Sequence, residues 1–235
     1  MNRTESHMNI VTGALESLST FEKFLWIFSL LSVTACYFFV PDKNPMTLLS
    51  SLFGVSLVLF VAKGTVLGQI FTVVFSVLYG IISFRTRYYS EMITYLGMNT
   101  PIAIATMIIW LKNPFKNTAE VTVAHMNAKK WTVLFVSGAA VTTAFFFILK
   151  ALHTENLPAC TVSIATSYVA SCLEFMRSPY YAAGFMANDA VLIALWIGAS
   201  LHDKSYISMS LCFAVFFIND LYGLINWQRM KKRQQ

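Results

Sequence analysis

Long apolar runs with almost no charge inside them make up most of this sequence. A helix needs about 20 mostly apolar residues to cross the hydrocarbon core of a bilayer, and eight stretches reach or approach that length. They are approximately residues 24–40, 47–62, 65–84, 92–111, 131–150, 159–176, 182–200 and 205–227. Each run is continuous, without the alternation that marks the strands of membrane barrels. The sequence therefore predicts an all-α membrane protein with about eight transmembrane helices.

The composition argues against a soluble domain. Of the 235 residues, 57% are hydrophobic and 12% are charged, whereas a soluble domain carries about 25% charged residues. So few charges cannot cover so apolar a chain in water. The four cysteines lie in or beside apolar runs and form no CxxC pair, so we expect reduced packing residues and no metal site. The polar stretch before the first run lacks the features of a cleavable signal peptide, so that run is expected to remain in the mature protein.

Basic residues are distributed unevenly between the two sides of the predicted bundle. If alternate loops face the same side, 12 of the 17 Lys and Arg residues lie on the side of both termini and 5 on the other. An excess of Lys and Arg marks the cytoplasmic side. Both termini are therefore predicted to be cytoplasmic, in a plasma or inner membrane. The basic stretch 229–233 belongs to this signal, and the net charge of +6 favours membrane lipid, not nucleic acid, as the partner.

A weak internal repeat appears when the chain is compared with itself at an offset of 117 residues. The matched pairs are Tyr79 with Trp196, Tyr89 with Tyr206, Met92 with Met209, Trp110 with Trp227 and Lys112 with Arg229. The predicted parts are an N-terminal tail with an extra helix (1–46), a first three-helix repeat (47–112), a loop and linker helix (113–156), and a second repeat with a basic tail (157–235). Two parallel repeats of this kind are one known way to build a carrier.

Polar residues inside the apolar runs are the candidates for a binding site. A charged side chain at the centre of a membrane helix costs about 2.5–3.5 kcal/mol on insertion scales. Two Asn–Asp pairs nevertheless occur there: Asn188 with Asp189 in the seventh run, and Asn219 with Asp220 in the eighth. We interpret these pairs as ligand-binding residues.

The eighth run also carries a polar stripe at helical spacing. Asn219, Tyr222 and Asn226 follow one another at i, i+3 and i+7 and so share one face of a helix. In the seventh run, Asp189 and Trp196 are seven residues apart and share a face in the same way. Amide, phenol and indole groups together suit an aromatic ligand that forms hydrogen bonds. The alternative is that these groups bond helices to one another, for about 1 kcal/mol each.

In the first half of the chain, Gln69 and Asn99 are the remaining polar candidates, and Pro101 is expected to open its helix and free a carbonyl group. Glu174 and Arg177 lie near the end of the sixth run. We predict that these two charged residues are interfacial and do not bind a ligand.

The run Phe-Ile-Asn-Asp-Leu-Tyr-Gly-Leu-Ile-Asn-Trp (217–227), followed by basic residues, resembles the ending of the Pnu family of vitamin transporters. Leu-Tyr-Gly-Ile (78–81) and Tyr-Tyr-Ser-Glu-Met-Ile (88–93) resemble the second and third repeat helices of that family. The resemblance covers about residues 48–232. It implies a fold related to the SWEET sugar transporters, often assembled as a homotrimer. It also implies facilitated diffusion of an unphosphorylated vitamin, which a cytoplasmic kinase then traps.

The resemblance also implies a substrate and a set of site residues. The substrate would be nicotinamide riboside, a pyridine nucleoside taken up for NAD biosynthesis, and no cofactor would be needed. Matching positions imply that Asn188, Asn219, Tyr222 and Asn226 line the substrate. Helical periodicity alone supports Asp189, Asp220 and Trp196. The riboside is expected between the two repeats, with its ring on Trp196 or Tyr222 and its ribose hydroxyls on Asn188, Asn219 and Asp189.

The sequence departs from the family at two places, which leaves alternatives open. Ala103 stands where the third repeat helix of the family often has a polar residue, and one motif also differs. The family's Trp-x-x-Trp-x-x-x-Asn reads Tyr181, Gly184 and Asn188 here, so thiamine, riboflavin or a deoxynucleoside could replace nicotinamide riboside as the substrate. A second alternative is a substrate-binding subunit that depends on an ATP-driven partner. No GxSxG, HExxH or phosphate-binding GxxxxGK[ST] pattern occurs, so we do not expect an enzyme.

Overall fold

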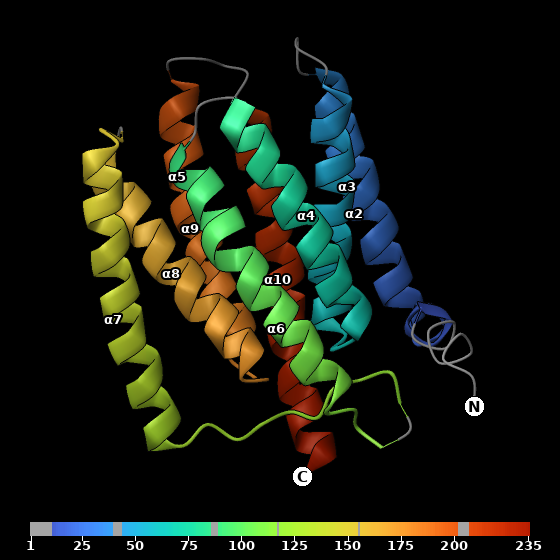
Figure 1. The fold of residues 1–235 in the computed structure, drawn as a ribbon. Coiled ribbons are helices and arrows are strands. Elements are labelled where there is room, and N and C mark those ends of the chain that lie inside the picture. The colour runs from blue at the N-terminus through green and yellow to red at the C-terminus, as the bar shows by residue number, and fades with distance from the viewer. Residues whose placement is uncertain (1–10, 40–43, 86–88, 117, 155, 202–206) are drawn as a thin grey trace.

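The computed structural model describes residues 11–39, 44–85, 89–116, 118–154, 156–201 and 207–235, and these form a bundle of long helices (Figure 1). A short helical segment at residues 11–16 precedes the bundle. The helices that follow are α2 (Thr20–Phe39), α3 (Pro45–Ala62), α4 (Val66–Arg85), α5 (Tyr89–Met92), the π-helix η1 (Ile93–Asn99), α6 (Thr100–Leu111), α7 (Ala128–Ala151), α8 (Leu157–Phe175), α9 (Tyr181–Ser200) and α10 (Ile207–Gln234). The described residues form only isolated β-bridges and no strand.

Local sequence signals explain where several helices begin. The Asn44 side chain accepts a hydrogen bond from the Met46 backbone N–H at 2.9 Å, and Pro45 occupies the first position of α3. Asn127 accepts a hydrogen bond from the Lys130 N–H in the same way at the start of α7. Both arrangements satisfy backbone donors that a helix start would otherwise leave free.

The prediction of an all-α membrane protein is confirmed. Seven spans among the described residues are long and apolar enough to cross a membrane: α2, α3, α4, the continuous stretch Tyr89–Leu111, α7, α9 and α10. The sixth predicted run corresponds to α8, which has 19 residues but is less apolar. Outward-facing side chains on α2 and α7, such as Phe24 and Val136, are largely exposed in the isolated chain, as expected for surfaces that face lipid.

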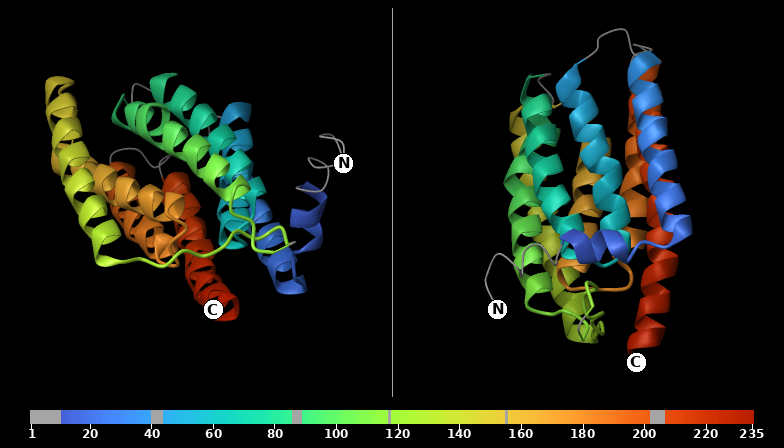
Figure 2. Two further views of the ribbon diagram at one scale, coloured as in Figure 1. Left: turned by 60° about the horizontal axis from the view of Figure 1, so that its bottom comes forward. Right: turned by 90° about the vertical axis from the view of Figure 1, so that its right-hand side faces the viewer.

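The helices form two groups of three with two additions (Figures 1 and 2). The first group contains α3, α4 and the stretch from α5 through η1 to α6; the second contains α8, α9 and α10. Helix α7 connects the groups and packs against α8, whereas α2 packs against both α3 and α10. The predicted division of the chain into two repeats, a linker and an extra helix stays a prediction, as does the symmetry between the two groups.

The two groups meet along two contacts, which we call the α3–α10 seam and the α6–α8 seam. At the first, the Trp227 indole N–H donates to the Val61 carbonyl at 3.0 Å. At the second, the Trp110 indole N–H donates to the Glu174 carbonyl at 3.3 Å. The two indoles are fully buried and their rings lie 5.5 Å apart. Trp227 of the second group thus contacts the end of α3, and Trp110 of the first group contacts the end of α8.

The predicted opening near Pro101 takes the form of a π-helical turn. The backbone from Ile93 to Asn99 is π-helical, and the Thr100 hydroxyl donates to the Tyr95 carbonyl at 2.8 Å. Proline lacks the N–H that would bond the carbonyl four residues earlier, and π-helical turns are frequent at functional sites. The π-helical turn ends at Asn99, the residue that contacts Ser167 and Ser171 of α8.

One end of the bundle is closed by the loop between α6 and α7. Arg177 donates to the Thr122 carbonyl at 3.1 Å, and the Val123 N–H donates to the Gln234 side chain at 2.7 Å. Helix α2 begins at this end, where Lys63 at the end of α3 is ion-paired with Glu22. Helix α10 continues into it, so that the basic tail predicted from the sequence is helical.

Candidate functional site

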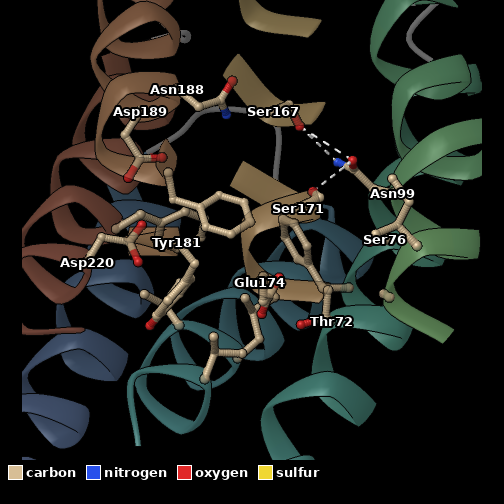
Figure 3. A pocket seen from close by; sticks show the side chains of 18 of the residues that line it. Thr72, Ser76, Asn99, Ser167, Ser171, Glu174, Tyr181, Asn188, Asp189 and Asp220 are labelled. Atoms are coloured by element: carbon tan, nitrogen blue, oxygen red, sulfur yellow. Dashed lines mark hydrogen bonds between the residues drawn. The ribbon is translucent and has the colours of Figure 1, made fainter. Parts of the chain in front are cut away.

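A cavity lies between the two helix groups and receives side chains from α3, α4, η1, α6, α8, α9 and α10 (Figure 3). Its polar lining residues are Thr72, Ser76, Asn99, Ser167, Ser171, Glu174, Tyr181, Asn188, Asp189 and Asp220. Its aromatic lining residues are Phe75, Tyr95, Tyr181, Phe185, Phe213 and Phe216. The cavity therefore combines ring faces with hydrogen-bonding groups, as small-molecule sites commonly do.

Helical spacing explains why these side chains converge. On α8, Ser167, Ser171 and Glu174 follow at i, i+4 and i+7 and so share one face. On α9, Tyr181 and Asn188 are seven residues apart and line the cavity together. The polar face of α8 also explains its lower apolarity, because that face turns toward the cavity and not toward lipid.

The amide groups of the cavity contact hydroxyl groups on α8. Asn99 donates to the Ser167 hydroxyl at 3.3 Å and accepts from the Ser171 hydroxyl at 3.5 Å (Figure 3). The Asn188 carbonyl oxygen accepts a hydrogen bond from Thr166 at 2.9 Å. These bonds orient both amides, and Asn99 spans the α6–α8 seam from the first group to the second.

The charged groups of the lining are all acidic. Glu174, Asp189 and Asp220 are 5%, 4% and 4% exposed, and no Lys, Arg or His is found among the described lining residues. Asp189 of α9 and Asp220 of α10 both line the cavity and lie on the same side of it (Figure 3). Buried negative charge without a basic neighbour attracts a cation and repels a phosphate group.

Several buried polar atoms in and beside the cavity have no hydrogen-bond partner. They are Asp189 Oδ2, the Tyr181 hydroxyl and Gln69 Oε1. The Gln69 amide nitrogen donates to the Glu174 carboxylate at 2.6 Å, which holds this pair beside the cavity. More than about 90% of buried polar groups in proteins are bonded. Of these atoms, Asp189 Oδ2 belongs to a carboxyl group of the cavity lining and can accept a hydrogen bond from a ligand.

The prediction that Glu174 is interfacial is wrong. The residue lies in the last turn of α8, where Trp110 of α6 and Gln69 of α4 cover it, and its carboxylate lines the cavity. Arg177, two residues beyond the helix end, instead holds the closing loop through Thr122. The end of this apolar run is therefore covered by other parts of the bundle and is not a surface position.

The polar stripe predicted on α10 faces α2 and α3, not the cavity. Asn219 donates to the Ser29 hydroxyl at 3.0 Å, the Tyr222 hydroxyl donates to the Glu22 carboxylate, and Asn226 donates to the Ala62 carbonyl at 2.9 Å. Asp220 is one residue after Asn219, which turns it by about 100° around the helix. Of the predicted residues on α10, the cavity receives Asp220 alone.

Trp196 also lies away from the cavity lining. It is 4% exposed and belongs to an apolar cluster with Val33, Val55, Phe75 and Tyr79. The structure brings together Asn99, Asn188, Asp189 and Asp220 from the predicted set, with Gln69 behind Glu174.

Several lining residues were not singled out from the sequence. Tyr181 was noted only as a departure from a family motif, yet its spacing of seven from Asn188 could have placed both on one face. Ser167 and Ser171 share the same spacing pattern with Glu174. Single serines in apolar runs are common, so the signal lies in their shared face and not in any one residue.

Gly184, where the family motif has tryptophan, lies at a close contact between α8 and α9. A Cβ atom at this position would lie 2.9 Å from the Ala170 Cα atom, which belongs to the backbone and cannot turn aside. We expect Gly184→Ala to separate the helices and lower stability by about 1–3 kcal/mol. The measurement is the thermal midpoint of the purified protein in detergent.

The matched control is Gly198→Ala on the same helix, because a Cβ atom there would meet nothing within 4 Å. Alanine favours helix over glycine by about 1 kcal/mol, so this variant is expected to be neutral or stabilised. Equal behaviour of the two variants would show that the contact at Gly184 is not tight.

Comparison with known proteins gives one consistent result. The sequence model of a family described as nicotinamide mononucleotide transporter matches residues 44–229. A nicotinamide riboside transporter PnuC from Neisseria mucosa is 22% identical over 214 residues, which cover 89% of this chain and 81% of that protein. A protein of the same name from Haemophilus influenzae is 22% identical over 199 residues, covering 84% of each chain.

A solved structure, described as the crystal structure of the vitamin B3 transporter PnuC, has the same fold. It superimposes with a TM-score of 0.83 at 22% sequence identity, and the match covers 96% of this chain and 98% of that one. The structural match covers more of the chain than the family model, which begins at residue 44, after α2.

Proposed function

Because this chain belongs to the nicotinamide mononucleotide transporter family, we propose that it carries nicotinamide riboside across the cell membrane. The resemblance to the Pnu transporters is thereby confirmed, and this family and the relatives named above are transporters, not enzymes. The observation that carries the proposal is the buried cavity between the two helix groups, which has three carboxyl groups, no basic lining residue among those described, and unpaired polar atoms.

The chemistry of the riboside fits this lining group by group. Its pyridinium ring is a cation, which buried carboxylates and aromatic ring faces attract. Its ribose hydroxyls and amide match Asn99, Asn188, Ser167 and Ser171, which are the polar groups along the cavity. The mononucleotide adds a phosphate group, for which this lining has acidic neighbours and no counter-charge. The cavity thus favours the nucleoside over its phosphate ester.

The carrier cycle that we propose is alternating access, in which the two helix groups rock about the bound riboside. The two seams differ because α2 packs against both helices of the α3–α10 seam. We therefore assign the hinge to the α3–α10 seam. The sequence has no phosphate-binding loop for a nucleotide, which agrees with passive, facilitated diffusion. Net uptake then follows when a cytoplasmic kinase phosphorylates the riboside, because the product no longer suits the cavity.

The proposed orientation has both termini in the cytoplasm. The 12 to 5 distribution of basic residues supports it. The start of α2, the loop after α6 and the end of α10 lie at the same end of the bundle (Figure 1), as that count assumes. By family resemblance we propose a homotrimer in the plasma or inner membrane.

Isothermal titration calorimetry on the detergent-solubilised protein tests the substrate. We expect saturable binding of nicotinamide riboside and at least about tenfold weaker binding of its mononucleotide. Thiamine, riboflavin and deoxynucleosides are titrated in parallel, and tight binding of one of them alone would replace the substrate. Uptake of labelled riboside by vesicles that contain only this chain would exclude dependence on an ATP-driven partner.

Two variants locate the site in the same experiment. Asn99→Ala removes an amide that lines the cavity, so riboside affinity should fall about tenfold. Trp196→Phe changes an aromatic residue outside the lining, and affinity should change by less than about twofold. The reverse pattern would place the riboside against Trp196 and reject this cavity as the site.

A further inference from the structure

A second pocket lies at the end of the bundle that the α6–α7 loop closes. Its lining comes from loop residues 124–126, Trp131 near the start of α7, Pro179 and Tyr180 between α8 and α9, and Lys231 in the last turn of α10. It shares no described lining residue with the cavity between the helix groups. We call it the α7–α10 pocket, after the two helices that contribute to it.

Hydrogen bonds join the walls of the α7–α10 pocket to one another. The Ala124 N–H donates to the Arg177 carbonyl at 2.9 Å, which ties the loop to the chain just after α8. The Gln228 side chain of α10 donates to the Pro179 carbonyl at 3.1 Å. Three parts of the chain that are far apart in the sequence are thus connected around the pocket, so its shape does not depend on a bound ligand.

The charged residues in the walls of this pocket are all basic. The walls belong to the segments 121–135, 176–188 and 221–235. These segments contain Lys and Arg but no Asp or Glu. Glu120, the acid that precedes the first segment, is already ion-paired with Arg233. Because a concave site with charges of one sign attracts ligands of the opposite sign, we expect an anion in this pocket.

Two lysine ammonium groups are held at the pocket and can bind such an anion. The Lys231 Nζ atom lies 6.0 Å from the centroid of the Tyr180 ring, whose face attracts a cation but carries no net charge. The Lys130 Nζ atom donates to the carbonyl of His125, a lining residue, at 2.8 Å. An ammonium group has three donors, so each lysine keeps donors for the oxygens of a phosphate group.

The aromatic residues beside the lysines indicate that the pocket lies at the membrane–water interface. The ring centroids of Trp131 and Tyr180 are 6.1 Å apart, and these two residue types are enriched at the level of the lipid headgroups. Trp131 also stacks on Phe135, one turn further along α7, with centroids 5.7 Å apart, and Phe135 is 59% exposed. An apolar surface therefore continues from the pocket along α7, where the acyl chains of a phospholipid can lie.

We propose that the α7–α10 pocket binds the phosphate group of an anionic phospholipid. A soluble phosphate ester offers the same anion, but only a lipid also uses the apolar surface of α7 next to the pocket. Basic pockets between membrane helices are a known type of site for anionic headgroups. The bound lipid connects α7 with α10 and so stabilises the bundle. This inference goes beyond solute transport and does not depend on which solute is carried.

Native mass spectrometry of the delipidated protein in detergent tests this site. The titration compares phosphatidylglycerol, which is anionic, with phosphatidylcholine, whose headgroup has no net charge. We expect about one phosphatidylglycerol molecule per chain at a low ratio of lipid to protein, bound at least about fivefold more tightly than phosphatidylcholine. Equal affinity for the two lipids would overturn the proposal.

Inorganic phosphate distinguishes the two sources of the anion. The thermal midpoint of the delipidated protein should rise with phosphatidylglycerol, because a ligand that binds the folded state stabilises it. Inorganic phosphate at the same free concentration should leave the midpoint unchanged, since it has no acyl chains to place against α7. A rise with phosphate that equals the rise with lipid, and that is lost in Lys231→Gln, would assign the pocket to a soluble anion and overturn the lipid site.

Lysine variants locate the lipid. Lys231→Gln and Lys130→Gln each remove one positive charge at the pocket, and affinity for phosphatidylglycerol should fall about fivefold in each. Lys232→Gln is the matched control, because it removes the same charge from the next position of α10, which is exposed and outside the described pocket lining. Its affinity should change by less than about twofold.

Equal losses of affinity in Lys231→Gln and Lys232→Gln would show a general attraction of the basic tail for anionic lipid, and would overturn the pocket as the site. If a variant at the pocket does not fold, the comparison of the two lipids on the wild-type protein decides the proposal.

Discussion

Linking η1 to α8 with a short chemical cross-link is expected to stop transport and leave ligand binding in place. Met98 and Ile164 are buried in one apolar cluster at the α6–α8 seam, and neither lines the cavity. In a cysteine-free background, Met98→Cys with Ile164→Cys can be joined by a bifunctional thiosulfonate. If the two groups must separate here, uptake into vesicles should drop to background after cross-linking and return after reduction.

The control cross-link lies on the other seam. Ala62→Cys with Asn226→Cys joins two positions whose present contact is a hydrogen bond of 2.9 Å. This seam is braced by α2, which contacts both α3 and α10, so we expect uptake to continue after cross-linking there. Equal loss of uptake in both pairs would contradict a hinge at the α3–α10 seam, and unchanged uptake in the first pair would contradict rocking of the groups.

Replacing Lys63 by methionine is expected to destabilise the bundle more than any other single change considered for this protein. The Lys63 ammonium bonds both carboxylate oxygens of Glu22, at 3.1 and 3.0 Å, and Glu22 is only 2% exposed. Without the lysine, a buried carboxylate between α2, α3 and α10 loses its counter-charge. Removal of one partner of a buried ion pair costs about 3 kcal/mol or more, which detergent-induced unfolding of the purified variant would measure.

Two further variants separate lost charge from lost packing. Glu22→Gln combined with Lys63→Met removes both charges and should recover most of the stability, because no unpaired ion remains. Lys150→Met is the matched control at an exposed position near the end of α7 and should have little effect. If the double variant is as unstable as Lys63→Met, the loss comes from packing at the end of α3 and not from the carboxylate.

The bundle could be predicted because its physical basis lies within short stretches of sequence. Each membrane span is a local run of apolar residues, and the helix starts at Asn44 and Asn127 follow from local capping. The extra N-terminal helix could also be predicted from its apolar run, but the helices against which it packs could not. Contacts such as that between Glu22 and Tyr222 join residues 200 positions apart, and no local pattern contains them.

The candidate site was predictable in part for the same reason. Helical periodicity places residues on one face of a helix but does not indicate which neighbouring helix that face contacts. Asn219 and Asp220 were therefore equally good candidates, although one meets Ser29 of α2 and the other the cavity. Glu174 was missed because its depth was judged from the end of an apolar run, whereas the α6–α7 loop and Trp110 cover that end.

The two indoles in contact where the helix groups meet, with ring planes tilted by 45°, provide an intrinsic optical signal of movement between the groups. Trp110 and Trp227 belong to different groups, are shielded from water, and lie close enough for their excited states to interact. Any rocking that changes their separation or tilt should alter the ultraviolet emission and the near-ultraviolet circular dichroism of the protein. In a variant whose other three tryptophans are replaced by phenylalanine, a spectral change on adding riboside would report movement between the groups and not stacking of the ligand on an indole, since no tryptophan is among the described lining residues.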